Sequence, residues 1–296
     1  MTASQPFELQ IIGERINPGF KSTKALFDNE DIGGIQALAV RQAEAGARYL
    51  NVNIGARALT DPAFMATVIK AIQQVVSIPL SFDFPSADVQ KVCLEAYDRG
   101  KAGGAAPIVN SITEHRWDLM DLYRSHGPFK VVLMASERVE DGQAKGNKTA
   151  QEIYDTARRC ALRLHRDYGM PFDDIFLDMS VSAIIADTTG LNRATLDAIR
   201  LIGTDADLEG VHMMGGLSNI GQQLPPKAAD GSELKHALEC AFLTIANPAG
   251  FDTVLGTPWR GYHPLPEDNY VLTAYRNFLE QTGSNALRAV RKFYKA

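Results

Sequence analysis

The sequence predicts a single (β/α)8 barrel domain over residues 1–296, because short apolar runs alternate eight times with stretches of helical periodicity. The runs are LQIIGE, RYLNVN, IPLSFD, PIVN, VVLMAS, IFLDM, VHMMGGLSN and DTVLGT. The polar residues at or near their ends are Glu14, Asn53, Asp83, Asn110, Ser136, Asp178, Asn219 and Thr257. In such a barrel the carboxyl ends of the strands build the active site. The same pattern therefore indicates where function should lie.

Helix boundaries between the runs have recognisable signals. Asp61 followed by Pro62 is typical of an N-cap and a first helical residue, and predicts a helix through Ile72. Thr149 with Glu152 three residues later predicts a capping box. The helix that follows carries an apolar stripe suited to packing on a sheet: Ile153, Ala157, Cys160, Ala161 and Leu164.

Two connections are longer or richer than the rest. Residues 136–148 form a polar, glycine-bearing stretch after the fifth run, and TPWRGYHPLP follows the eighth. In a barrel both lie on the catalytic rim, where long loops act as lids or partner surfaces. Trp259, Arg260 and Tyr262 are of the residue types enriched at interface hot spots. The alternative for both stretches is a solvated connection.

Composition limits the class of function. A net charge of -5 without a cluster of Lys or Arg argues against a nucleic-acid surface. There is no signal-peptide pattern and no apolar run of membrane-spanning length, so we expect a cytoplasmic protein. Cys93, Cys160 and Cys240 are scattered singly through predicted helices. We expect reduced core thiols and no zinc site.

The strand ends carry amides and separated carboxylates rather than catalytic motifs. There is no G-x-S-x-G or H-E-x-x-H, and no predicted strand ends on histidine. The set Asn53, Asp83, Asn110, Asp178 and Asn219 suits a flat heterocycle with several N–H groups. A carboxylate can accept two adjacent donors, such as the ring N–H and exocyclic amine of a 2-amino-4-oxo-pyrimidine. The alternative is that these side chains only cap helices.

Six segments in the right order resemble the pterin-binding barrel family over nearly the whole chain. They are Gly13–Asn17 (GERIN), Asn51–Gly55 (NVNIG), Phe82–Asp83 (FD), Val109–Ser111 (VNS), Leu177–Met179 (LDM) and Gly216–Asn219 (GLSN). GERIN, together with GLSN followed by Gln222, is most similar to the methyltetrahydrofolate:corrinoid methyltransferases. Asn51 is a departure, because many relatives carry an acidic residue there.

The resemblance implies roles for individual residues. Asp83, Asn110 and Asp178 correspond to positions that hold the pyrimidine edge of the pterin, and Asn219 to the catalytic asparagine near N5, the atom that bears the methyl group. The wider implied pterin site also contains Glu14, Asn53, Gly216, Ser218 and Gln222. For Glu14 the alternative is a structural ion pair with Arg15.

The implied reaction moves a methyl group between N5 of (methyl)tetrahydrofolate and the cobalt of a corrinoid, without a resident metal and in a direction that the sequence leaves open. The chain is used up by one barrel, and the residue two before His212 is Gly210 rather than the Asp of the corrinoid motif Asp-x-His-x-x-Gly. We therefore expect cobalamin to be carried by a separate corrinoid protein docked over the rim. The resemblance also implies a homodimer.

Two alternatives remain open. Dihydropteroate synthase uses the same barrel, but it must bind a pyrophosphate and therefore needs Lys and Arg after the seventh and eighth strands. Here Arg260 is the only cation near those ends. The other alternative is a non-catalytic pterin carrier or corrinoid-docking module, which would bind folate without transferring a methyl group.

Overall fold

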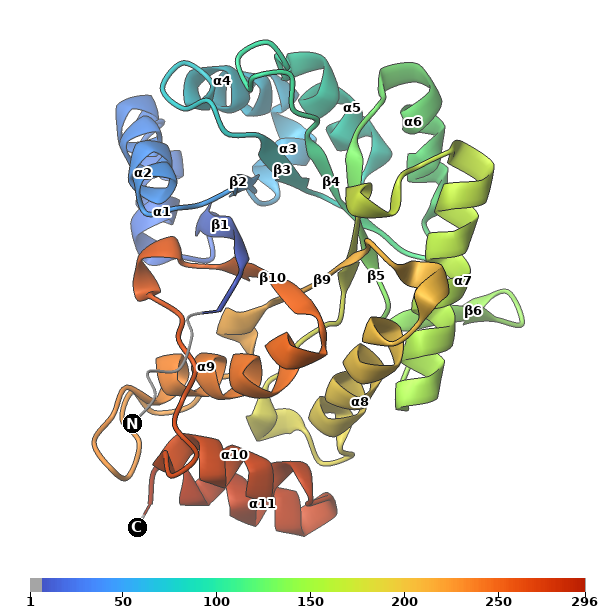
Figure 1. Ribbon diagram of the computed structural model, residues 1–296. Helices are drawn as coiled ribbons and strands as arrows, with labels where there is room; N and C mark the ends of the chain where they lie inside the picture. The colour runs from blue at the N-terminus through green and yellow to red at the C-terminus, as the bar shows by residue number, and fades with distance from the viewer. Residues whose placement is uncertain (1–6, 296) are drawn as a thin grey trace.

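The eight predicted strands close into one parallel barrel in the computed structural model, which describes residues 7–295. Around the barrel the order is β1-β10-β9-β8-β5-β4-β3-β2 (Figure 1). The barrel strands are β1 (Gln10–Ile16), β2 (Tyr49–Val52), β3 (Leu80–Asp83), β4 (Ile108–Ile112), β5 (Lys130–Met134), β8 (Ile175–Asp178), β9 (His212–Gly216) and β10 (Phe251–Gly256). The predicted (β/α)8 fold class is confirmed.

Helices surround this barrel on the outside (Figure 1). They are α1 (Lys21–Asp28), α2 (Ile32–Glu44), α3 (Arg57–Thr60), α4 (Pro62–Ile72), α5 (Ala87–Ala96), α6 (Asp121–His126), α7 (Ala150–Tyr168), α8 (Leu191–Gly203), α9 (Leu234–Ala246), α10 (Tyr270–Leu279) and α11 (Gly283–Lys292). Asp61 caps α4 by accepting a hydrogen bond from the Phe64 N–H, and Thr149 with Glu152 forms the predicted capping box of α7. The predicted apolar stripe of α7 is buried.

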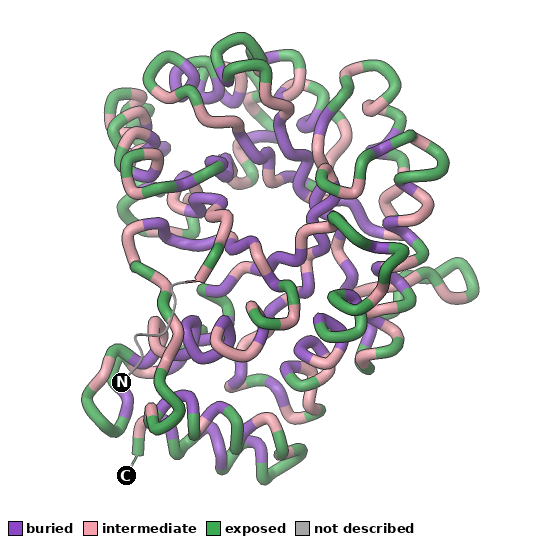
Figure 2. Tube along the Cα trace, in the orientation of Figure 1, coloured by how far each residue is buried: buried purple, intermediate pink, exposed green. Residues whose placement is uncertain are grey.

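Successive side chains of a strand alternate between the helices and the barrel interior. In the lower half of the interior, apolar side chains from six strands form a buried cluster, to which Leu255 adds from β10: Ile12, Tyr49, Ile108, Val132, Phe176 and Met214. Tyr49 of β2 and Phe176 of β8 meet edge to face across the barrel, with ring centroids 5.9 Å apart. In Figure 2 many of the buried residues lie along the strands of the barrel. This cluster fills the interior and forms a floor beneath the carboxyl ends of the strands.

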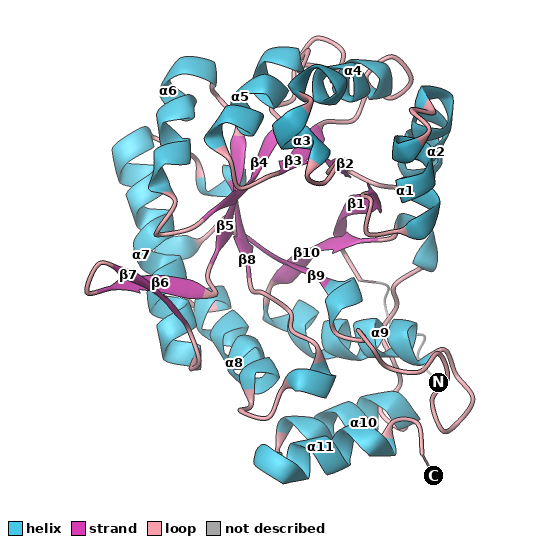
Figure 3. Cartoon of the chain, turned by 180° about the vertical axis from the view of Figure 1, so that it is seen from behind, coloured by secondary structure: helices cyan, strands magenta, loops and turns pink. Residues whose placement is uncertain are grey.

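The polar stretch at residues 136–148 is a hairpin rather than an irregular loop. Antiparallel strands β6 (Glu137–Glu140) and β7 (Gln143–Gly146) are joined through Asp141 and Gly142, both with positive φ. Two positive φ values match the twist that a two-residue hairpin turn requires. The hairpin projects away from the barrel axis beyond α7 (Figure 3). Ser136 therefore belongs to the hairpin base, where its carbonyl oxygen accepts the Asn147 N–H.

Two further features bear on function. His212 begins β9 at the floor of the barrel, where its ring stacks on Phe176, so its partial corrinoid-like spacing lies at the end opposite the open mouth. Among residues 7–295, no helix has both the length and the apolar character needed to cross a membrane.

Candidate functional site

A polar layer lies directly above the apolar floor, because each inward-facing floor residue is followed two positions later by another inward-facing side chain. On β8, for example, Phe176 belongs to the floor and Asp178 to the layer above it. Asp83 of β3 is in register with Asn110 of β4, so their side chains lie next to each other at the mouth. The structure thus brings together the predicted strand-end carboxylates and amides.

Asp83 is the centre of a hydrogen-bond network. Its Oδ2 accepts from Nδ2 of Asn51 at 3.1 Å and from Nδ2 of Asn53 at 3.2 Å. Nδ2 of Asn110 in turn donates to Oδ1 of Asn51 at 3.4 Å. Asn51, the position where relatives carry an acid, is buried and holds the network together. A neutral amide at this position avoids a second negative charge beside Asp83, and the other Asp83 oxygen is left to accept from a ligand.

Asp178 is the second carboxylate of the layer. Burial raises the pKa of its carboxyl to about 6, the Ser180 N–H at 2.7 Å opposes the rise, and the negative charge of Asp83 adds to it. The two negative charges repel each other, and a ligand that donates hydrogen bonds to both carboxylates would relieve this repulsion. The arrangement is suited to a ligand with adjacent N–H groups.

These carboxylates are not helix caps. The N-cap of α5 is Ser86 rather than Asp83, and the Asp178 carboxylate bonds to a turn N–H two residues on. Asn53 differs, since its Oδ1 accepts the Gly55 N–H at 2.7 Å and so also shapes a turn. Capping therefore does not account for Asp83 or Asp178.

Asn219 ends a short 3-10 turn (Leu217–Asn219) directly after β9 and is exposed. Gln222 donates from Nε2 to Asn219 Oδ1 at 2.7 Å, which leaves Nδ2 of Asn219 as a donor. That nitrogen lies over Gly216: a Cβ at Gly216 would come within 3.0 Å of it. The Asn219 amide can occupy this position because Gly216 has no side chain.

Glu14 connects three strand ends. Its carboxylate accepts from Ser218 Oγ at 3.0 Å and from Thr257 Oγ1 at 2.8 Å. Burial raises the pKa of Glu14, and the two hydroxyl donors partly counter the rise. The guanidinium of Arg15 instead lies over the Phe20 ring, 3.7 Å from its centroid. Glu14 therefore stabilises the turn that carries Asn219. It does not form the alternative ion pair with Arg15.

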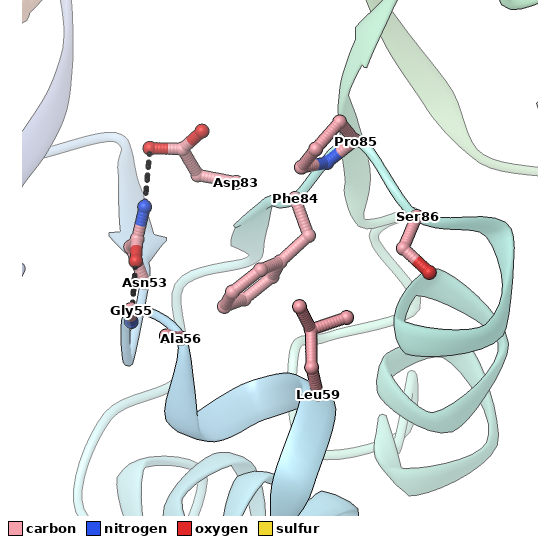
Figure 4. A pocket seen from close by; sticks show the side chains of 8 residues that line it. All are labelled: Asn53, Gly55, Ala56, Leu59, Asp83, Phe84, Pro85 and Ser86. Carbon is pink, nitrogen blue, oxygen red and sulfur yellow. Dashed lines mark hydrogen bonds between the residues drawn. The ribbon is translucent and has the colours of Figure 1, made fainter.

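A cavity of about 470 Å³ opens beside the polar layer (Figure 4). It shares two residues with that layer, Asn53 and Asp83, and its other walls are mostly apolar: Gly55, Ala56, Leu59, Phe84, Pro85 and Ser86. Leu59 is 67% exposed, so the cavity leads from a carboxylate to solvent along an apolar wall. Most of its residues come from the β2–α3 and β3–α5 connections at the carboxyl ends of the strands, with Leu59 from α3 and Asp83 from the end of β3.

The arginines at the rim after β10 contact an aromatic ring or carboxylates. Trp259 lies under the guanidinium of Arg41, 3.8 Å from the ring centroid. Arg260 bonds Glu233 at 2.7 Å and lies 3.4 Å from a carboxylate oxygen of Glu239. Arg260, the cation that the sequence offers near the seventh and eighth strand ends, is therefore already neutralised, whereas Arg15 and Arg41 contact the Trp259 ring at the same rim.

Sequence reasoning missed Arg116, which lies beside the ends of β4 and β5. Its Nη2 donates to Ser111 Oγ at 3.4 Å, and its Nε is buried without a hydrogen-bond partner in the described part of the chain. The backbone N–H of Arg116 donates to Thr113 Oγ1 at 3.1 Å. A threonine three residues before Arg116 is therefore the sequence feature that could have predicted the turn on which this arginine lies.

Comparison with known proteins agrees with this geometry. Residues 15–255 match the family model described as pterin binding enzyme. The chain belongs to the pterin binding enzyme family. It is 25% identical over 256 residues to a methylcorrinoid:tetrahydrofolate methyltransferase of Eubacterium limosum, with 84% of each chain covered.

Solved structures of the pterin-binding barrel share the fold at lower identity. Dihydropteroate synthase of Xanthomonas albilineans with 4-aminobenzoic acid is 17% identical, covers 95% of both chains and has a TM-score of 0.60. Dihydropteroate synthase of Thermus thermophilus is 18% identical, covers 86% of this chain and 90% of its own, and has a TM-score of 0.58. At these identities the likeness shows the barrel fold alone. The predicted pterin-binding family is confirmed by the family model, and the reaction is a separate question.

Proposed function

We propose that this protein transfers a methyl group between N5 of (methyl)tetrahydrofolate and the cobalt of a corrinoid held by a separate protein. The observation that carries the proposal is the Asn219 amide, held by Gln222 above Gly216 at the same barrel mouth as Asp83 and Asp178. Membership of the pterin binding enzyme family and the methyltransferase named above, 25% identical, support it.

Recognition of the pterin follows from the polar layer. The free acceptor positions of Asp83 and Asp178 suit the ring N–H and exocyclic amine of the pterin, and the mixed donor and acceptor of Asn110 suits its neighbouring edge. Entry of two or more donors between the carboxylates relieves their mutual repulsion. The apolar cavity beside Asp83 offers room for the aminobenzoyl ring of folate.

The demand on the protein at N5 is electrostatic. A tertiary amine leaves poorly until its nitrogen gains a proton or a strong hydrogen bond. Nδ2 of Asn219 is a donor suited to the nitrogen lone pair that develops as the methyl group departs. Because Asn219 has no titratable proton, any proton reaches N5 from solvent or a carboxyl group. The structure offers Glu14, whose pKa is raised by burial and which bonds Ser218, the residue before Asn219.

The corrinoid partner supplies cobalt in its Co(I) state, a nucleophile that needs access and alignment. The chain contributes an open mouth and a methyl donor held in a fixed orientation. Transfer from methylcorrinoid to tetrahydrofolate would use the same groups by microscopic reversibility. We also propose that the chain is one domain, cytoplasmic and homodimeric, as expected from the sequence.

The ion pairs at the rim argue against the dihydropteroate synthase alternative, which needs cations available for a pyrophosphate. Arg260, a cation near the ends of β9 and β10, is paired with Glu233 and Glu239, and Arg15 and Arg41 lie against the Trp259 ring. A pyrophosphate would have to displace two carboxylates to reach Arg260. We therefore expect no condensation of a pterin pyrophosphate with 4-aminobenzoate.

A spectral assay tests the proposal. Purified protein is mixed with methyltetrahydrofolate and chemically reduced free cobalamin, and the loss of the Co(I) spectrum is followed. We expect a rate proportional to protein concentration. Folate binding by calorimetry without any transfer would favour the non-catalytic module, and dihydropteroate formation in a parallel assay would favour the synthase.

A further inference from the structure

Three ligand-type side chains converge outside the pterin site. His236 and Cys240 lie one helical turn apart on α9, and His263 comes from the connection between β10 and α10. Their ligand atoms lie within 4.8 Å of one another. Cys240 Sγ is 3.7 Å from Nε2 of His236 and 4.0 Å from Nδ1 of His263.

These distances are close to those of a tetrahedral zinc site. With a Zn–S bond of about 2.3 Å and a Zn–N bond of about 2.05 Å, a sulfur and a nitrogen ligand lie roughly 3.6 Å apart. The distance to His236 is close to that value, and the distance to His263 exceeds it by a few tenths of an ångström. A small inward movement of His263, which is exposed, would complete the geometry.

The second ring nitrogen of His236 faces a buried carboxylate. Nδ1 of His236 lies 3.7 Å from Oε2 of Glu239, and neither atom has a hydrogen-bond partner in the described structure, although Nε of Arg260 lies 3.4 Å from the same oxygen. Glu239 is only 2% exposed. A carboxylate behind a metal-bound histidine fixes its tautomer and strengthens it as a ligand. The unsatisfied pair is thus explained if Nε2 is the ligating atom.

We propose that His236, Cys240 and His263 bind one Zn²⁺ ion that ties the connection after β10 to α9, with a solvent molecule as the fourth ligand. Zinc fits this mixed set of imidazole and thiolate ligands. Binding through Nδ1 of His263 displaces its present hydrogen bond to the Gly261 carbonyl, at 3.0 Å. This proposal departs from the sequence-based expectation of no zinc site, at a place outside the pterin pocket.

A nucleophilic role for the thiol is disfavoured. Cys240 is fully buried, whereas a reactive cysteine needs access to its substrate. A simple S–H hydrogen bond to His236 would not require the approach of His263 from another segment. This inference does not depend on the proposed methyl transfer, because none of the three ligands belongs to the pterin site.

The test uses the full chain stripped of metal with a chelator and then titrated with Zn²⁺ or Co²⁺. We expect one ion per chain, a cobalt–thiolate charge-transfer band, and a higher melting temperature with zinc. Cys240→Ser and His263→Asn should each lose at least tenfold in metal affinity. Cys240→Ser should also lose the charge-transfer band, and His263→Asn should lose the thermal shift. Glu239→Gln, which keeps all three ligands, should lose about tenfold in affinity.

Cys160→Ser, at a buried thiol on α7, is the matched control and should bind zinc as the wild type does. His263 is exposed, so His263→Asn decides the question if Cys240→Ser fails to fold. The absence of stoichiometric zinc, or equal zinc affinity in His263→Asn and the wild type, would overturn the proposal.

Discussion

Gln222 donates a hydrogen bond of 2.7 Å to Oδ1 of Asn219, and this contact leaves the amide nitrogen of Asn219 beside Gly216 at the end of β9. If that amide acts at N5 as charge develops, Asn219→Ala should slow methyl transfer more than it weakens folate binding. We expect a rate loss of roughly 10–1,000-fold, the range for one preorganised hydrogen bond. Stopped-flow rates and calorimetric affinities measure the two effects separately. Equal losses in both would make Asn219 a plain binding residue.

Gly216 gives a second test of the same contact. A methyl group at Gly216 would lie 3.0 Å from Asn219 Nδ2, while the backbone at Gly216, with φ of -78°, accepts alanine. Gly216→Ala should therefore displace the amide and lower the transfer rate about tenfold, with the melting temperature nearly unchanged. Gly146→Ala is the control, because a Cβ there meets no atom within 4 Å. Full activity in Gly216→Ala would show that transfer does not depend on the position of the Asn219 amide beside Gly216.

Substitution of the carboxylates proposed to bind the pterin edge should weaken folate binding. Asp83→Asn or Asp178→Asn replaces a double acceptor by a mixed group, so that one donor faces another. We expect each change to cost about 1–3 kcal/mol of folate binding, measured by calorimetry. Circular dichroism should show an unchanged fold. Unaltered affinity in both variants would remove these residues from the site.

The raised pKa of Asp178, about 6 against an ordinary 3.8, also predicts a pH dependence of stability. Between these values the folded state binds more protons than the unfolded state, so the free energy of unfolding should fall as pH rises toward 6 and level off above it. Asp178→Asn lacks this titration. The variant should gain on the order of 1–3 kcal/mol relative to wild type between about pH 4 and pH 8, in urea melts. A constant difference across that range would contradict the assignment.

Docking of the corrinoid protein is expected over Trp259. Trp259→Ala removes the ring under Arg41 and should impair transfer with the corrinoid protein while sparing folate binding and transfer with free cobalamin. Tyr262 is a poorer probe than the sequence suggests, since burial raises its pKa and its hydroxyl occupies the space that a Cβ at Gly256 would need. An equal effect on both cobalamin sources would place Trp259 in the folate pocket or the fold. Co-purification of a tightly bound corrinoid with this chain alone would refute the two-protein arrangement.

Strand positions are predictable from the sequence because a parallel barrel buries each strand on both faces, which produces continuous apolar runs. The hairpin is harder to recognise, because β6 and β7 lack an apolar alternation. Its one signal is the Asp141-Gly142 pair, which is typical of a tight hairpin turn.

The candidate site is predictable to different degrees. Asp83 and Asn110 follow from their strand-end positions, because parallel strands end at one edge. Which hydrogen bond each group makes does not follow, since Asn51 and Gln222 act through contacts that only the folded chain creates. The cluster of His236, Cys240 and His263 escapes sequence reasoning for a related reason. Two of its members share a helix face, but the third lies 23 residues further on and meets them only in the folded chain.

The closed floor of the barrel has a kinetic consequence. Tyr49 and Phe176 meet across the interior beneath the polar layer, so in the described part of the chain the mouth is the direct approach to that layer for small molecules. A corrinoid protein seated on that mouth would cover the same passage. Folate must then enter first and leave last, and turnover should follow a compulsory order. Dead-end inhibition by a non-methylated folate analogue should be competitive toward folate, and excess corrinoid protein should trap the product on the enzyme.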